Sequence, residues 1–393
     1  MGWLRDGGNP SSLHRVGRRA REVVEHGRAQ VARFLGAEHP SEVVFGSSGT
    51  ELNNTILRTH ARPGSAVDAH FVVSSLEHPS VRVCAQHLGD HGVETTELPC
   101  GADGRVLPEH VEGAIRAETR LVALMLANNE VGTVQDVAAV AEICRRRGVP
   151  LLCDAVQAAG KIGFDVASLG ADYVVIAGHK MNGPLGAAAA WIRPGVAFEA
   201  LLEGGGQERR RRASTENVAA CGGLGLACAL VDEELEVRSQ RMLDLRERFE
   251  DGLKNIPGAW VNCEQSQRLP NTTNVGFEGV DAQQLLIRLD LQGFAVSTGS
   301  ACASGSVEPS PTLLQVGLDG RRALSCLRVS NGLGNEVAQI DRFLGALEDA
   351  VAHLRGSRGY VRRTRSDSEA DSAVRSRRAE THEQPKASAE VTR

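Results

Sequence analysis

The chain has 393 residues, with 44 Lys and Arg against 49 Asp and Glu and a formal net charge of −5. This balance argues against nucleic acid as the main partner, because phosphate binding needs a concentrated basic surface. The sequence contains neither an apolar run of the roughly 20 residues that span a bilayer nor an N-terminal secretory signal, so we expect a cytoplasmic protein that does not bind membranes.

The first two thirds of the sequence alternate short apolar runs with helical patterns. We expect strands at residues 42–45, 69–74, 121–126, 150–153 and 173–176. Val134–Arg147 has helical spacing of its apolar residues, and Cys100–Arg105 contains an Asp-Gly turn signal. This alternation predicts an α/β fold in which helices cover a mostly parallel sheet.

A second, smaller unit follows a long polar helical pattern at roughly Val231–Lys254. From Asn274 to about Leu354, strand and helix signals lie on either side of a Gly/Ser-rich loop. After Arg355 the chain is rich in Arg, Ser and Glu and has too few large apolar residues to offset the entropy of ordering. We therefore predict a large α/β domain at 1–237, a small α+β domain at 238–355 and a disordered charged tail at 356–393.

Two candidate site residues directly follow predicted strands, where α/β sheets bind ligands. Lys180 lies in Gly178-His179-Lys180, and partial burial would lower its pKa and suit a Schiff base with a carbonyl cofactor. Asp154 ends another strand, where a carboxylate could keep the pyridine nitrogen of pyridoxal phosphate protonated. A surface lysine and a helix N-cap are the alternatives for each residue alone. The presence of both residues favours a pyridoxal phosphate site over these alternatives.

Other motifs supply groups that would complete such a site. The segment Gly46–Glu51 precedes a helix and could bind a phosphate, although a capping box looks similar. His78 could stack on a cofactor ring and transfer protons, and Asn129 offers an amide to a phenolic oxygen. Arg328 could bind a substrate carboxylate through two hydrogen bonds.

The nine cysteines contain no CxxC pair, which indicates reduced thiols and predicts neither a metal site nor a disulfide framework. Cys302 differs from the others because it lies among small residues in the loop Ser297–Ser306. A flexible loop of this kind is poorly suited to core packing. It suits a mobile nucleophile instead.

In this order, the motifs resemble the cysteine desulfurases, the NifS/IscS-like family of the class-V aminotransferase superfamily. The resemblance extends from Gly8 to about Val351, and the matching stretches are GGNPSSLHRVGRRA, VVFGSSGTELNN, SSLEHPSVR, LANNEVGTVQD, CDAVQAAGKIGFD, AGHKMNGPLG, GGGQERRRRASTEN, STGSACASGSVEPSPTLL and LRVSNGLG. It implies a pyridoxal-phosphate-dependent enzyme of fold type I, the aspartate-aminotransferase type, which forms a homodimer. Family members have a further segment upstream of the GNPSS motif, and we expect that segment to be missing here.

The resemblance also assigns roles to individual residues. Lys180 resembles the Schiff-base lysine, and Asp154 resembles the partner of the pyridine nitrogen. Asn129 and Gln157 resemble the residues that contact the phenolic oxygen of the cofactor. The phosphate contacts are implied for Gly49, Thr50, His179 and, from the other subunit, Thr215. His78 resembles the acid–base residue that stacks on the cofactor ring. Asn129 and Arg328 are expected to bind the substrate.

The implied reaction converts L-cysteine to L-alanine and leaves a persulfide on Cys302, which passes sulfur to an acceptor protein. Iron–sulfur cluster assembly, tRNA thiolation and a dedicated biosynthetic pathway all remain open as destinations. Two positions differ from the family pattern, since Ala177 replaces a common serine and Leu185 a frequent lysine. Ala177, together with the motifs LANNE and GGGQER, is also similar to selenocysteine lyases, so a selenocysteine lyase is one alternative function. An alternative from a different class is a catalytically impaired scaffold for sulfur transfer.

Overall fold

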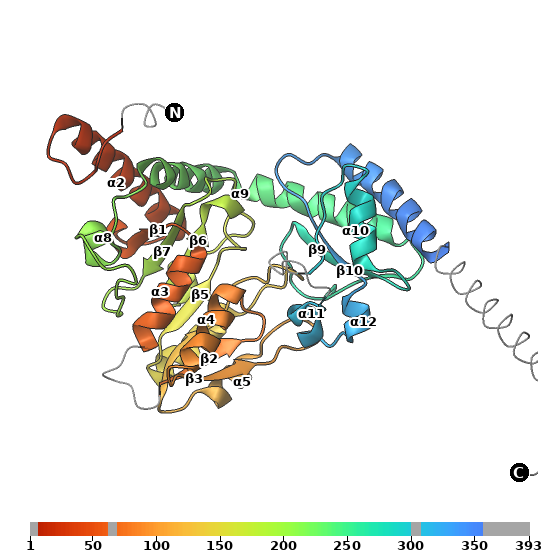
Figure 1. Ribbon diagram of the computed structural model, residues 1–393, viewed down its shortest axis with the longest axis horizontal. Helices are drawn as coiled ribbons and strands as arrows, with labels where there is room; N and C mark the ends of the chain where they lie inside the picture. Colours follow the sequence, from red (N-terminus) through yellow and green to blue (C-terminus); the bar gives the residue numbers. More distant parts are fainter. Residues whose placement is uncertain (1–6, 62–68, 300–307, 357–393) are drawn as a thin grey trace, which may run out of the picture.

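The computed structural model describes residues 7–61, 69–299 and 308–356, which contain a large and a small β-sheet (Figure 1). The large sheet has seven strands in the order β1-β7-β6-β5-β4-β2-β3. Their bounds are β1 Val43–Gly46, β2 His70–Ser74, β3 Glu94–Leu98, β4 Thr119–Ala123, β5 Leu151–Asp154, β6 Tyr173–Ala177 and β7 Ala188–Ile192. Only β7 is antiparallel to its neighbours β1 and β6. The predicted α/β fold with a mixed, mostly parallel sheet is confirmed.

Strands β3 and β7 were not predicted, for two different reasons. The sequence of β3 is ETTEL, and it lies at the edge of the sheet with only its last residue buried. The sequence of β7 begins with three alanines, which have low strand propensity, yet all five of its residues are buried. Among the predicted strands, 121–126 is the least accurate, because β4 ends at Ala123.

Helices cover both faces of the large sheet. These are α2 Arg15–Leu35, α3 Gly49–Ala61, α4 Pro79–Gly89, α5 Pro108–Ala114, α6 Val137–Arg147, α7 Val166–Leu169, α8 Gln207–Arg210 and α9 Val218–Leu253, with short 3-10 turns η1 Pro40–Glu42 and η2 Gly178–Lys180. Neighbouring strand residues enter different hydrophobic clusters, because successive side chains point to opposite faces: Val72 and Val174 belong to one cluster, Phe71 and Val175 to the other. The sheet is therefore buried between two helical layers.

Helices α2 and α9 cross in close contact on one of these faces. A Cβ atom at Gly225 in α9 would lie 2.4 Å from the Cα atom of Gly27 in α2, and one at Gly27 would lie 2.6 Å from the Cys221 carbonyl oxygen. Both contacts are too short for any real side chain. Glycine at both positions is thus required for this crossing.

The small sheet has the order β10-β9-β8, with β8 Ala259–Val261, β9 Thr272–Phe277 and β10 Cys326–Ser330, all antiparallel. The helices α10 Ala282–Asp290, α11 Pro311–Gln315 and α12 Gly320–Ala323 and the helical residues 337–356 accompany it. Its own hydrophobic cluster includes Phe249, Phe277 and Leu327. The second unit thus has a separate core.

Helix α9 connects the two units without interruption. Leu224, Cys228 and Val231 pack in the core of the large unit, whereas Leu245, Phe249 and Leu253 pack in that of the small unit. The division between residues 237 and 238 falls inside this helix and stays a prediction. The predicted tail lies outside the described residues from 357 onward. None of the helices in the described ranges has the length and apolarity that crossing a membrane requires.

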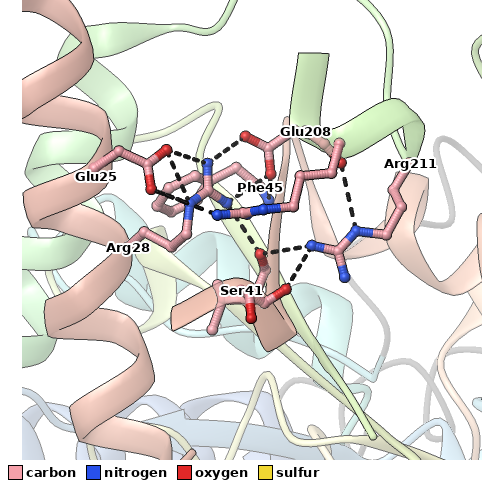
Figure 2. A network of polar contacts seen from close by, with 8 residues as sticks. Glu25, Arg28, Ser41, Phe45, Glu208 and Arg211 are labelled. Atoms are coloured by element: carbon pink, nitrogen blue, oxygen red, sulfur yellow. Dashed lines mark hydrogen bonds and ion pairs between the residues drawn. The ribbon is translucent and has the colours of Figure 1, made fainter. Parts of the chain in front are cut away.

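A buried ion pair joins α2, β1 and α8 (Figure 2). The Arg28 guanidinium donates to both carboxylate oxygens of Glu208, at 2.7 and 2.6 Å, and to the Val43 carbonyl oxygen at 3.0 Å. Glu208 also accepts the Phe45 backbone N–H at 2.9 Å. Glu208, Arg209 and Arg210 have φ angles of 46°, 57° and 66°, a left-handed conformation that needs such support.

Candidate active site

Asp154, the last residue of β5, is buried at the carboxyl end of the sheet. Its Oδ1 accepts the Val156 backbone N–H at 3.0 Å, and its Oδ2 accepts Asn53 Nδ2 at 2.7 Å. Burial raises the pKa of the Asp154 carboxyl, while these donors and the nearby His78 act in the opposite direction. A buried carboxylate with two donors is suited to accept a proton-bearing ring nitrogen.

His78 follows β2 and is the N-cap of α4, where its Nδ1 accepts the Ser80 backbone N–H at 3.1 Å. Burial lowers the pKa of the His78 imidazole, Asp154 raises it and Lys180 lowers it further. His78 is close to Asp154, because Asn53 Nδ2 lies 2.7 Å from Asp154 Oδ2 and 3.0 Å from Ser80 Oγ, which lies 2.8 Å from His78 Nδ1. Lys180 follows β6, the strand that pairs with β5. The structure thus brings together three predicted site residues that follow three different strands.

Lys180 ends η2, the turn that follows β6, and its side chain is exposed. The expectation that Lys180 is partly buried is wrong for a single copy of the chain. The buried lysine is Lys161, which is 8% exposed and donates from Nζ to the Gln157 carbonyl oxygen at 2.7 Å and the Lys180 carbonyl oxygen at 3.4 Å. Burial, and secondly Lys180, lower the pKa of Lys161 to about 7. Sequence reasoning missed Lys161, although it lies between Asp154 and Lys180 in the chain.

The predicted phosphate ligands Gly49 and Thr50 begin α3. A Cβ atom at Gly49 would lie 3.1 Å from Val156 Cγ2, so glycine keeps the start of this helix in contact with the residues after Asp154. The capping contact considered from the sequence is also present, because Ser48 Oγ accepts the Glu51 N–H at 3.1 Å. The two interpretations are compatible, since capping leaves the helix dipole directed at this end.

Residues of the small sheet reach the same region. Arg328 in β10 donates from Nη1 to the Asn129 carbonyl oxygen at 3.0 Å. The next residue, Glu130, has a pKa raised by burial and lowered in part by Arg328. Asn129 and Gln157 are half-buried, and His179 is exposed beside Lys180. Arg328 and Asn129 therefore lie together, as expected for two residues that bind the same substrate.

Two predicted residues are not in this group. Thr215 lines a separate cavity of about 220 Å³ with Phe45 and Arg212, and neither Asp154 nor Lys180 lines it. Cys302 lies outside the described residues.

Glu77 is a buried carboxyl group that sequence reasoning did not single out. Its Oε1 accepts the Met125 backbone N–H, and its Oε2 has no partner within the described ranges. Burial, and secondly Asp154, raise its pKa to about 8, so Glu77 is mostly neutral at pH 7. The sequence signal was its position beside His78, but the sequence does not show that the side chain is buried.

The chemistry of these groups fits pyridoxal phosphate. A helix N-terminus at Gly49 suits a phosphate, the carboxylate of Asp154 suits a pyridinium nitrogen, and the amine of Lys180 suits an aldehyde. The three come from the carboxyl-end side of one sheet, where open α/β folds bind ligands.

Known proteins resemble this chain in sequence and structure. The family model described as aminotransferase class-V matches residues 4–343. A protein named cysteine desulfurase IscS, from Methanosarcina thermophila, is 39% identical over 348 residues, which are 88% of this chain and 86% of that protein. The solved structure of a NifS-like protein has a TM-score of 0.83 at 34% identity and covers 89% of this chain and 93% of its own. A structure described as SspA in complex with cysteine has a TM-score of 0.75 at 29% identity, covering 84% and 93%.

Proposed function

This chain belongs to the class-V aminotransferase family and is a pyridoxal-phosphate-dependent cysteine desulfurase, and from that premise we propose that Asp154, His78 and Lys180 form its catalytic centre. The observation that supports this most is the chain of hydrogen bonds from Asp154 through Asn53 and Ser80 to His78, with Lys180 following β6, the strand that pairs with β5. When bound, the cofactor supplies an electron sink for bond breaking next to the substrate's amino carbon.

Each residue has a distinct part in holding the cofactor. Asp154 keeps the ring nitrogen protonated, and the Lys180 amine binds the aldehyde. Gly49, Thr50 and His179 bind the phosphate, and Asn129 and Gln157 bind the phenolic oxygen. The helix N-terminus at Gly49 and the buried carboxylate of Asp154 support these assignments.

The substrate L-cysteine is held by Arg328, whose guanidinium is oriented by its hydrogen bond to the Asn129 carbonyl oxygen. A guanidinium presents its N–H groups in a fork that matches a carboxylate. His78 stacks on the cofactor ring and transfers a proton at the substrate. One protein of similar fold has been solved with cysteine bound, which supports this choice of substrate.

Cys302 accepts the substrate's sulfur as a persulfide, and alanine is the product. All eight that the structure describes have a thiol pKa raised chiefly by burial, so each is a poor nucleophile: Cys84, Cys100, Cys144, Cys153, Cys221, Cys228, Cys263 and Cys326. Cys302 is the remaining cysteine of nine.

We further propose a cytoplasmic homodimer in which Thr215 of one copy completes the phosphate site of the other. The resemblance to cysteine desulfurases supports this role, and Thr215 lines a cavity together with Gly46 and Ser47, at the start of the proposed phosphate segment. Exposed leucines on the large unit, including Leu185 at 82% and Leu226 at 54%, offer apolar surface for association. The sulfur then passes to an acceptor protein, for which iron–sulfur cluster assembly and tRNA thiolation are the candidate destinations.

Replacing Cys302 tests the proposal. Cys302→Ala should keep the yellow colour of bound cofactor but lose the persulfide that mass spectrometry detects after incubation with cysteine. Cys263→Ala is the matched control, because Cys263 is only half-buried and should be dispensable. Undiminished persulfide formation and sulfur delivery by Cys302→Ala would refute the role of Cys302. A colourless wild-type protein would refute the catalytic centre.

A further inference from the structure

We propose that Asn53 and Ser80 form a directional hydrogen-bond chain that links Asp154 to His78 and fixes the ring proton of His78 on Nε2. The inference rests on the proposed function of Asp154 and His78, and it adds two positioning residues to the site. Neither Asn53 nor Ser80 is expected to contact the substrate.

The chain is buried and continuous. Asn53, in α3, is 1% exposed, and its Nδ2 lies 2.7 Å from Asp154 Oδ2 and 3.0 Å from Ser80 Oγ. Ser80, in α4, is 7% exposed, and its Oγ lies 2.8 Å from His78 Nδ1. The contacts therefore run from β5 through α3 to the N-terminus of α4.

The hydrogen atoms in this chain can point in only one direction. An ionised Asp154 accepts but cannot donate, so Asn53 must present its NH₂ group to it. The second hydrogen of the same NH₂ group reaches Ser80 Oγ, which leaves the hydroxyl hydrogen of Ser80 for His78 Nδ1. The opposite amide orientation would direct the Asn53 oxygen at the carboxylate, a repulsive contact.

His78 Nδ1 therefore faces two donors, the Ser80 hydroxyl at 2.8 Å and the Ser80 backbone N–H at 3.1 Å. A ring nitrogen that accepts from two donors holds no proton, and a neutral imidazole then has its proton on Nε2. His78 is thus a neutral hydrogen-bond donor at rest. It gains a second proton only after the Ser80 hydroxyl turns and the backbone contact is lost.

The same chain affects Asp154. Asn53 is one of two donors to a carboxylate whose burial favours the protonated form. The ionisable groups that influence Asp154 and His78 are Glu77, Cys153 and Lys180, in addition to each other. Since Glu77 is largely neutral at pH 7, Asn53 acts on the only buried carboxylate of this group that is expected to be ionised.

Three variants and a matched control test the chain in the cofactor-bound protein. Asn53→Leu removes both donors at similar volume. Ser80→Ala removes the hydroxyl, and Ser80→Thr restores it. Asn54→Ala is the control, because Asn54 donates to the Ser80 backbone carbonyl at 2.9 Å and does not contact Asp154. Asn53→Leu should weaken pyridoxal phosphate binding about 10-fold or more, the effect of losing one hydrogen bond to a charged group. Asn54→Ala should change binding by less than about 3-fold.

The decisive readout is the nitrogen-15 spectrum of labelled histidines, with the His78 signals identified by their loss in His78→Gln. Wild type should show an unprotonated Nδ1 and a protonated Nε2. Ser80→Ala removes one of the two donors to Nδ1 but keeps the backbone N–H, so it should raise the fraction of His78 protonated on Nδ1 while the Nε2 tautomer persists, and Ser80→Thr should restore the wild-type fraction. A single unchanged tautomer in Ser80→Ala, or unchanged cofactor affinity in Asn53→Leu, would overturn the inference. Failure of the wild-type enzyme to form a persulfide would instead refute the proposed function, because the tautomer is measured independently of turnover.

Discussion

Replacing Arg28 by methionine should strongly destabilise this protein. Arg28 and Glu208 are each 2% exposed, and two short hydrogen bonds join them (Figure 2). In Arg28→Met the Glu208 carboxylate would stay buried with only the Phe45 N–H as a donor. Breaking a buried ion pair from one side costs about 3–5 kcal/mol, because the remaining charge is uncompensated.

The double variant Arg28→Met/Glu208→Gln separates this cost from the value of the pair. The new glutamine side chain would be neutral and could still accept the Phe45 N–H, while methionine fills the volume of the arginine stem. The main remaining loss is the hydrogen bond to the Val43 carbonyl oxygen, worth about 1 kcal/mol. The double variant should therefore be more stable than Arg28→Met by about 2 kcal/mol or more.

Urea unfolding followed by circular dichroism, with saturating pyridoxal phosphate, measures these differences as changes in midpoint at constant slope. The matched control is Arg248→Met, since Arg248 forms a comparable two-point pair with Asp341 at the surface. Arg248→Met should leave the midpoint unchanged, because solvent screens an exposed pair. Equal midpoints for Arg28→Met and Arg248→Met, or a double variant no more stable than Arg28→Met, would refute this prediction.

Two pH-dependent predictions follow from buried groups near the site. The folded-state pKa of Glu77 is raised from 4.5 to about 8, so the folded protein loses stability as rising pH ionises the buried carboxyl group. Between pH 6 and pH 9, the free energy of unfolding of Glu77→Gln, measured in urea, should rise by about 3 kcal/mol relative to wild type. A gap between the two proteins that does not change with pH would contradict this. Lys161 has the opposite sign: its pKa is lowered from 10.5 to about 7, so charging it costs stability as pH falls through this range. Lys161→Met should gain in melting temperature relative to wild type from pH 10 to pH 7, and a shift in the other direction would exclude a buried, neutral Lys161.

Much of the site could be predicted because local signals locate the strands in the sequence. Apolar runs located β2, β5 and β6, and the residues after them, His78, Asp154 and Lys180, meet because parallel strands end at one edge of a sheet. The cluster of these three residues is the part of the site that local pattern determines.

The remainder depends on contacts between distant parts of the chain. Arg28 looks like a surface residue of an amphipathic helix, and its burial depends on Glu208, which lies 180 residues later. The local sequences around Lys161 and Glu77 do not identify either side chain as buried, and their pKa values are perturbed because distant segments remove water from them. No local period indicates such burial, so these residues appear only in the folded chain.

The glycine contact between α2 and α9 lies at the opposite end of α9 from the small sheet. Helix α9 has 36 residues and is about 54 Å long at 1.5 Å per residue, so it behaves as a stiff rod from Val218 to Leu253. Near one end of α9, Gly225 packs closely against Gly27. The other end of α9 packs against the small sheet, which contains Arg328. Because α9 is stiff, a small tilt of the helix at Gly225 displaces its distant end by a larger amount. A methyl group added at Gly225 would therefore displace the Arg328 guanidinium, for which we propose substrate binding, although Gly225 lies in the other unit.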